Sequence, residues 1–328
     1  IKPASLEAAA NAAVNSISVD SRQGVEAAAY LSHEWKPLER LSLIYGLRLT
    51  DFMVMGPGTF YSYDSDGEPT DEHVYGSKVI KHYLNLEPRF SASYMLNNKS
   101  SVKASYNRIA QNLHQLTNTT SSLPTDQYVV SSALIKPQIA DQVALGYFRN
   151  FKDNSYEFSV EAYYKYLDNQ IDFRNDADLQ ANKFLEGDLL FGVGRAYGLE
   201  WLLRKNEGKF TGWISYTLAK SERRFDGIND GRWYNARQDR THDISLVGMY
   251  ALSKKWSLGA TFVYNTGNAI TFPSGKYSVD NKTMFYYTER NGYRMPSYHR
   301  LDLSATYEPQ KDSKRMHSSW SFGLYNAY

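Results

Sequence analysis

Apolar and polar residues alternate one by one in successive blocks along this chain. Between residues 156 and 166, one stripe is Phe158, Val160, Ala162, Tyr164 and Tyr166, and the other is Glu157, Ser159, Glu161, Tyr163 and Lys165. A period of two places such stripes on opposite faces of a β-strand. The pattern therefore predicts an all-β chain.

The alternating blocks pair into hairpins, each closed by a short polar turn of the kind that tight hairpins require. The predicted strand pairs are 25–36 with 41–55, 81–96 with 100–116, 139–151 with 156–173, 192–205 with 209–225, 241–252 with 256–272, and 300–309 with 318–328. The other connections are long, at 56–80, 117–137, 174–190, 226–240 and 273–299. Short turns would then lie at one end of an antiparallel meander and long loops at the other.

Composition only partly decides whether this β protein is soluble or spans a membrane. No apolar run reaches the ~18 residues of a membrane helix, so a membrane-spanning form must be a closed barrel of strands. The chain has 27 Tyr, 15 Phe and 6 Trp, which suit aromatic girdles at the two membrane interfaces but equally suit a soluble all-β protein. The alternation of short and long connections favours the transmembrane barrel, whose long loops lie outside the cell.

The register of alternation assigns the faces of the barrel. Predicted to face lipid are Leu43, Tyr45, Val160, Tyr164, Leu199, Trp201, Leu258 and Phe262. Predicted to face the lumen are Arg48, Glu161, Glu200 and Thr261, in inward rows that also contain Glu87, Arg89, Arg204, Asp243 and Asp302. Such rows indicate a wet lumen or a polar plug.

Several function classes find no support in the residues. The net charge of +2 gives no electrostatic basis for nucleic-acid binding, and the absence of Cys excludes thiol chemistry. Neither a Gly-x-Ser-x-Gly elbow nor a His-Glu-x-x-His motif occurs, so no catalytic residue, metal site or cofactor is predicted. An outer-membrane enzyme would need a Ser/His or Asp/His constellation near one rim, which the sequence does not assemble.

The acidic loop 64–68 resembles part of a calcium loop. With Gly67 at position six of that pattern, Ser62 is first and His73 is twelfth, where an acidic ligand and a bidentate Glu are required. We therefore expect a solvated acidic loop.

Four stretches together resemble the TonB-dependent outer-membrane receptors, particularly those of Bacteroidetes-type bacteria. They are LNLEPRFSASYML (84–96), IKPQIADQVALGYFRNF (135–151), GVGRAYGLEWLLRK (192–205) and RLDLSATYEP (300–309). The resemblance implies a barrel of about 22 strands around an N-terminal plug, of which this chain would supply about twelve. These would be roughly strands 10 to 21 of that barrel.

The resemblance also implies how the chain is divided. Residues 1–24 are expected to be the end of an extracellular loop, and residues 25–328 barrel strands without plug or TonB box. No signal peptide is visible, and Asn326 stands where alternation calls for an apolar residue in a closing strand. We expect an internal fragment of a longer outer-membrane protein.

The function that the resemblance implies is energy-coupled uptake of a scarce solute: a glycan, siderophore, vitamin or peptide. The expected partners are that solute, outer-membrane lipid and lipopolysaccharide, the TonB complex acting through the plug, and, as a further candidate, a surface lipoprotein. The alternative is a passive porin or structural barrel, which a plug and TonB box in the full gene would exclude.

Aromatic clusters in the long loops are the candidate solute contacts. They contain Tyr61 and Tyr63, Trp233 and Tyr234, and Tyr286 and Tyr287. Flat aromatic faces suit sugar rings, planar chelates or peptides, although packing of loops on one another would use the same residues. The cations Arg223, Arg224, Arg232, Arg237 and Arg240 would recruit an anion, or pair with acidic loops or lipopolysaccharide phosphates.

Overall fold

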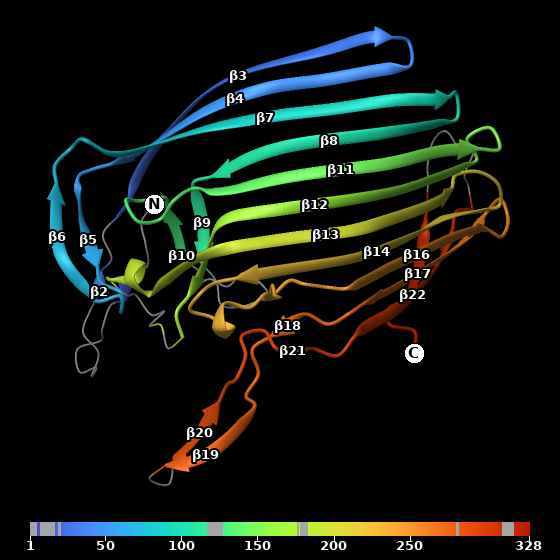
Figure 1. Cartoon of the computed structure of the whole chain (residues 1–328). Coiled ribbons are helices and arrows are strands. Elements are labelled where there is room, and N and C mark those ends of the chain that lie inside the picture. Colours follow the sequence, from blue (N-terminus) through green and yellow to red (C-terminus); the bar gives the residue numbers. More distant parts are fainter. Residues whose placement is uncertain are drawn as a thin grey trace.

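The computed structural model of the chain describes residues 5–6, 17–18, 21–116, 127–175, 177, 183–279, 282–309 and 318–328. Its main element is a curved antiparallel meander in which successive long strands are hydrogen-bonded neighbours (Figure 1). The long strands are β3 (Gln23–Leu38), β4 (Leu41–Met55), β7 (Val79–Asn97), β8 (Ser100–Gln111), β11 (Gln138–Phe151), β12 (Tyr156–Phe173), β13 (Leu189–Lys205), β14 (Phe210–Arg224), β16 (His242–Ala251), β17 (Trp256–Asn265), β22 (Tyr298–Tyr307) and β23 (Trp320–Leu324). The predicted all-β meander of twelve strands is confirmed, with β3 and β23 as its two edges.

The short turns lie at one end of the sheet, here called the turn end, and the long connections at the other, the loop end (Figure 1). The loops carry small elements that the alternation did not predict. These are β1 (Ser5–Leu6) with β2 (Ile17–Ser18), β5 (Gly58–Tyr63) with β6 (Pro69–Tyr75), β9 (Leu113–Leu116) with β10 (Gln127–Val130), β15 (Tyr234–Asn235) beside β14, β18 (Ala269–Ile270) with β21 (Tyr293–Arg294), β19 (Gly275–Val279) with β20 (Lys282–Tyr286), and the 3-10 helices η1 (Leu185–Asp188) and η2 (Asn229–Gly231). In the part of the chain that the structure describes, no helix is long and apolar enough to span a membrane.

Two predicted strands are wrong in length because the chain leaves the sheet early at the loop end, and the predicted strand 318–328 is found only as Trp320–Leu324. The predicted strand 100–116 divides into β8 and β9, and 256–272 divides into β17 and β18. Gly267 marks the second departure: a Cβ there would lie 1.9 Å from the carbonyl oxygen of Met295. This close approach of two loop segments requires glycine.

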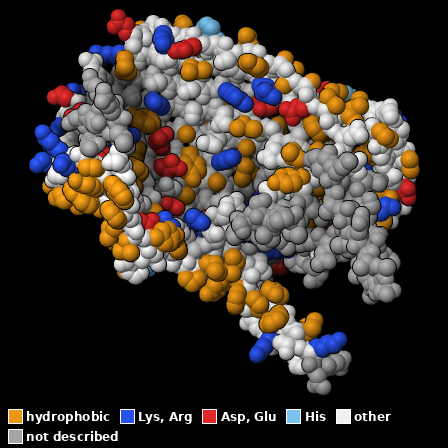
Figure 2. All heavy atoms as spheres, turned by 180° about the vertical axis from the view of Figure 1, so that it is seen from behind, with side chains coloured by type: hydrophobic (Ala, Val, Ile, Leu, Met, Phe, Trp, Pro, Cys, Tyr) orange, Lys and Arg blue, Asp and Glu red, His pale blue; other side chains and the backbone are white. Residues whose placement is uncertain are grey.

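The cross-strand contacts agree with the predicted faces. On the inner face, the Arg48 guanidinium pairs with Glu26, and Thr50 Oγ1 donates to Glu87 Oε1 at 2.6 Å. On the outer face, Trp201 stacks on Tyr216 with ring centroids 5.3 Å apart, and Tyr164 stacks on Tyr197. Charged side chains gather along the hollow of the sheet (Figure 2). The wall is therefore polar inside and apolar outside.

The outer face holds a shallow apolar hollow of about 610 Å³ over β14, β16, β17, β22 and β23. Its walls include Phe210, Tyr250, Leu258 and Phe322, while Gly248 leaves space between them. An apolar surface of this kind on the outside of a barrel contacts lipid chains.

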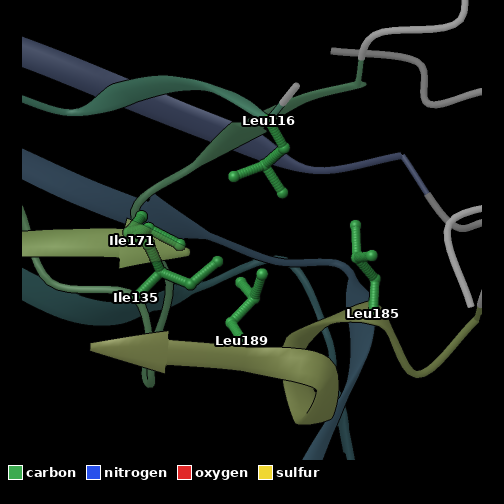
Figure 3. Close-up of a cluster of buried hydrophobic side chains, with 5 residues drawn as sticks. All are labelled: Leu116, Ile135, Ile171, Leu185 and Leu189. Atoms are coloured by element: carbon green, nitrogen blue, oxygen red, sulfur yellow. The ribbon is translucent and has the colours of Figure 1, made fainter. Parts of the chain in front are cut away.

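The buried apolar clusters lie at the loop end, where the loops fold back over the inner side of the sheet. One cluster joins five residues from four segments of the chain: Leu116, Ile135, Ile171, Leu185 and Leu189 (Figure 3). A second joins Phe52, Val54 and Phe60, and a third joins Phe225, Ile228 and Tyr234. These clusters hold the loops to the sheet and so position the surface described next.

The face assignment predicts a large difference between two adjacent positions of β14. Ile214 is 51% exposed on the outer face, halfway between Phe210 and Lys220, whereas Ser215 faces the lumen. Ile214→Lys should destabilise the folded full-length receptor by about 2–4 kcal/mol, and Ser215→Lys by less than about 1 kcal/mol. Urea unfolding in lipid vesicles measures both, and equal losses would contradict the assignment.

Candidate functional site

Two adjoining clefts open at the loop end on the inner side of the sheet. One has a volume of about 280 Å³ and is bounded by β9, the end of β12 and residues 237–238. The other has a volume of about 730 Å³ and lies between residues 173–175 with 177, residues 226–230 and residues 285–290. Phe173 and Arg237 line both clefts, so these two residues form their junction.

A buried carboxylate organises the junction. Asp172, whose side chain is 10% exposed, ends the inner stripe of β12. Its Oδ1 accepts a hydrogen bond from Arg290 Nη1 at 2.7 Å, and its Oδ2 accepts one from the Tyr234 hydroxyl at 3.0 Å. Arg223 Nη1 lies 4.0 Å from the same Oδ2. Burial is tolerated because the carboxylate is paired and hydrogen-bonded.

The surroundings of this carboxylate are positively charged. Arg223, Arg237 and Arg290 supply three cations against the one charge of Asp172, a net charge of +2. Burial lowers the pKa of the Arg237 guanidinium from its usual value, and Asp172 opposes that shift. Arginine stays protonated even so, and three cations therefore surround this carboxylate, while Asp226, Asp230 and Glu289 line the larger cleft.

Two arginines fasten the segment 287–297 to the rest of the loop end. Arg290 also donates to the Phe173 carbonyl oxygen at 3.1 Å and to Asn175 Oδ1 at 2.9 Å. Arg294 donates to the carbonyl oxygens of Asp239 and Gly267 and pairs with the Asp239 carboxylate. These planar forks fix the segment that carries one wall of the larger cleft.

His114 in β9 lines the smaller cleft and is only 2% exposed. Its Nε2 lies 3.1 Å from Ser131 Oγ, while Nδ1 has no hydrogen-bond partner among the described residues. Burial lowers the pKa of this imidazole to about 4, so it is neutral at physiological pH. His114 therefore gives the smaller cleft a polar wall without adding charge.

The structure separates the six predicted aromatic contacts. Tyr286 and Tyr287 line the larger cleft, and both are more than half exposed. Tyr234 lies behind the junction, 7% exposed, where burial and Asp172 raise the pKa of its phenol. Only the first two offer open faces to a solute in these clefts.

Tyr61 and Tyr63 lie in β5, away from both clefts. The Tyr61 ring packs edge-on against Phe184, and Lys183 lies over it at 5.3 Å. Tyr63 packs against Gly187 of η1, and burial raises the pKa of its phenol. This pair joins the β5–β6 hairpin to the segment around η1.

Trp233 lies over the outer face instead of the lumen. Its ring is 4.2 Å from the Arg195 guanidinium and 5.1 Å from that of Arg224, both on outward-facing positions of β13 and β14. The predicted arginine group therefore divides as well: Arg223 and Arg237 face the clefts, and Arg224 faces outward. Arg232 and Arg240 are exposed, beside Asp230 and Asn268.

The residues that sequence analysis missed are Asp172, Arg290, Arg294 and His114. Asp172 gave no signal of this kind, because the alternation in residues 157–166 puts position 172 in the outward phase, and the register shift between Leu167 and Gln170 turns it inward. Its partner Arg290 is 118 residues away in an irregular loop, and no periodicity connects the two.

A polar-inside, apolar-outside meander with long loops at one end defines the wall of a transmembrane β-barrel. The comparisons agree. The chain matches the family model for the TonB-dependent receptor-like β-barrel over residues 4–327. It belongs to that family, and its strands are part of an outer-membrane barrel.

Solved structures show the same fold at low sequence identity. The copper transporter OprC has a TM-score of 0.61 at 15% identity, with 92% of this chain and 43% of that chain covered. The ferric-catecholate import receptor Fiu from K12 E. coli has a TM-score of 0.57 at 16% identity, with 93% of this chain and 40% of that chain covered. The ferripyoverdine receptor of the outer membrane of Pseudomonas aeruginosa has a TM-score of 0.59 at 14% identity, with 95% of this chain and 35% of that chain covered. The chain thus spans less than half the length of each, and no curated protein matches it in sequence.

Proposed function

We propose that this barrel belongs to a receptor that takes up a scarce anionic solute across the outer membrane with energy from the TonB complex. The observation that supports it most is the junction of the two clefts, where three arginines surround one carboxylate. Family membership supports the class of transport, and the charge of the junction supports the class of solute.

The solute would bind at the loop end, between the arginines and the two exposed tyrosines. An arginine fork holds carboxylate, phosphate or catecholate oxygens through paired hydrogen bonds. Tyr286 and Tyr287 would cover a flat part of the solute, as aromatic residues do in binding sites. A metal chelate with anionic oxygens fits both requirements. The solutes named for the receptor Fiu and for the ferripyoverdine receptor, ferric catecholate and ferripyoverdine, are of this kind.

The barrel wall itself does no covalent chemistry in this proposal. We propose that residues 25–328 supply barrel strands and that residues 1–24 end an extracellular loop. Release into the periplasm would follow when the TonB complex acts on a plug within the complete barrel. Loops, plug and wall would together enclose the solute, since the clefts seen here are open.

A binding panel tests the solute class. The full-length receptor in detergent is titrated with ferric catecholates, ferric carboxylates, neutral oligosaccharides and cobalamin, followed by intrinsic fluorescence. We expect saturable binding of an anionic chelate that weakens as salt is raised, because salt screens exposed charges. Binding of a neutral oligosaccharide alone, with no salt dependence, would refute the anionic class. A passive porin would bind none of them tightly.

A further inference from the structure

The shallow apolar hollow on the outer face lies close to the turn end of the wall. Its floor is formed by small residues, because Gly248, Ala260 and Ala305 occupy outward positions on β16, β17 and β22. Phe210 on β14 and Phe322 on β23, the outermost of its strands, carry larger side chains. The volume of about 610 Å³ falls within the range of about 300–1,000 Å³ that ligand pockets have. The outside of the wall therefore has a recess with room for a lipid chain.

The depth of this hollow in the membrane follows from an aromatic pair at the turn end of β17 and β22. Trp256 and Tyr307 are outward cross-strand partners whose ring centroids lie 4.9 Å apart. Aromatic residues of this kind mark the interface between membrane and water. The four residues from Trp256 to Ala260 rise about 13 Å along the strand, or about 10 Å across a tilted wall. The hollow therefore lies at acyl-chain depth, in the leaflet next to the short turns.

Three lysines lie just beyond this interface, in two turns that adjoin the hollow. Lys254 and Lys255 belong to the turn between β16 and β17, and Lys209 directly precedes β14. The backbone brings them together, because the Ala251 N–H donates to the Lys209 carbonyl oxygen at 2.7 Å and the Glu308 N–H donates to that of Lys255 at 2.8 Å. All three lysines are exposed, and none forms an ion pair with the described residues. With Glu308 as the one described carboxylate at these turns, the local net charge is +2.

Lysines at other short turns are paired within the protein. Lys36 Nζ lies 2.9 Å from Glu34 Oε1, and Lys99 Nζ lies 3.7 Å from Asp153 Oδ1. Lys205 Nζ donates to two backbone carbonyl oxygens of its own turn, at 2.7 Å and 2.6 Å. The lysines beside the hollow lack such compensation within the described residues, so their charge is available to an anionic headgroup.

We propose that the hollow and the lysines at positions 209, 254 and 255 form a binding site for one anionic phospholipid of the periplasmic leaflet. Its phosphate would lie among the lysines and one acyl chain in the hollow. The short turns face that leaflet, because the long loops lie outside the cell. A lipid tail gains little by leaving other tails for an apolar wall, so the charge selects an anionic headgroup and the hollow fixes the place of the chain. The site is separate from the solute clefts, which lie on the inner side.

Lipid binding to the full-length receptor tests the role of the lysines. The delipidated receptor is titrated with phosphatidylglycerol and with phosphatidylethanolamine of the same acyl chains, by native mass spectrometry. The wild type should bind phosphatidylglycerol more tightly, and Lys254→Gln with Lys255→Gln should weaken that binding about 30-fold, which is about 1 kcal/mol for each charge. Lys99→Gln with Lys152→Gln, which removes two cations from other short turns, should leave it unchanged.

Filling the hollow tests where the acyl chain lies. Ala260→Phe should weaken binding of phosphatidylglycerol about 10-fold, because about ten carbon contacts of the chain would be lost. Ala162→Phe is the matched control, since Ala162 faces outward between Leu145 and Leu199 on other strands. In addition, phosphatidylglycerol with a photoreactive acyl chain should cross-link mainly to β16, β17 and β22.

Four results would overturn the proposal. The first is equal wild-type binding of the two phospholipids, a comparison that needs no variant to fold. The second is unchanged phosphatidylglycerol binding in the double lysine variant or in Ala260→Phe, once heat-resistance on gels has shown that the variant is folded. The third is cross-linking spread evenly around the barrel. The fourth is a receptor dimer that excludes the lipid, which would identify the hollow as a contact between two copies of the chain.

Discussion

Arg290→Gln is expected to cause the largest loss of solute binding of any single substitution at the loop end. The change removes the fork that joins Asp172 Oδ1, the Phe173 carbonyl and Asn175. Losing one partner of a buried ion pair costs about 3–5 kcal/mol. The segment that carries Tyr287 would then detach, and we expect solute affinity to fall by at least about 100-fold. Uptake of labelled solute at limiting concentration measures this loss.

Arg232→Gln is the matched control, because Arg232 also ties the segment that carries Arg290 to a neighbouring loop, but from the outside. It pairs with Asp230 and Glu289, but its side chain is 63% exposed. Exposed pairs contribute about 0–1 kcal/mol, so uptake should remain near the wild-type level. Hydrogen exchange should rise in residues 285–294 of the Arg290 variant only. Equal exchange in both variants would show that Asp172 does not anchor this segment.

Arg237→Gln should produce the second largest effect, since this side chain lines both clefts. A hydrogen bond from a charged donor contributes about 1.5–3 kcal/mol, so affinity for an anionic solute should fall roughly 10- to 100-fold. The salt dependence of the remaining binding should become shallower, because one cation has been removed. Titration at several salt concentrations measures both quantities.

Arg240→Gln removes the same charge from the same loop and serves as control for Arg237. Arg240 is exposed and donates to Asn268 Oδ1 at 2.8 Å, without lining either cleft. If both substitutions weaken binding equally, the loop acts through its general charge, and the junction has no specific role.

The strands were predictable because their physics is local. In β4, Leu41–Met55 was predicted with its observed bounds, from the alternation of lipid-facing and lumen-facing residues between Leu41 and Thr50. The predicted strand 139–151 is found as Gln138–Phe151, bounded by a turn whose Lys152, Asp153 and Asn154 have positive φ angles. A membrane wall imposes one rule on every strand, and that rule is visible in the residues.

The loops were not predictable in the same way, because tertiary contacts determine them. β10 lies within a connection taken as irregular, whereas β9 was taken as the end of the strand 100–116, and four residues are too few for periodicity to be recognised. The junction forms only when Asp172 at the end of β12 meets Arg237 and Arg290 from two separate loops. The sequence did indicate that Arg195, the residue that Trp233 stacks on, faces outward. Arg195 is in phase with Tyr197, Leu199 and Trp201 on the lipid side.

The most direct test of a TonB-dependent uptake receptor is transport by intact cells that carry the full-length protein. Uptake of the bound solute is measured in wild-type cells, in cells lacking the TonB complex, and after the proton motive force is collapsed. We expect saturable uptake in the first and surface binding without accumulation in the other two. Equal accumulation in all three would identify a passive pore and contradict the account.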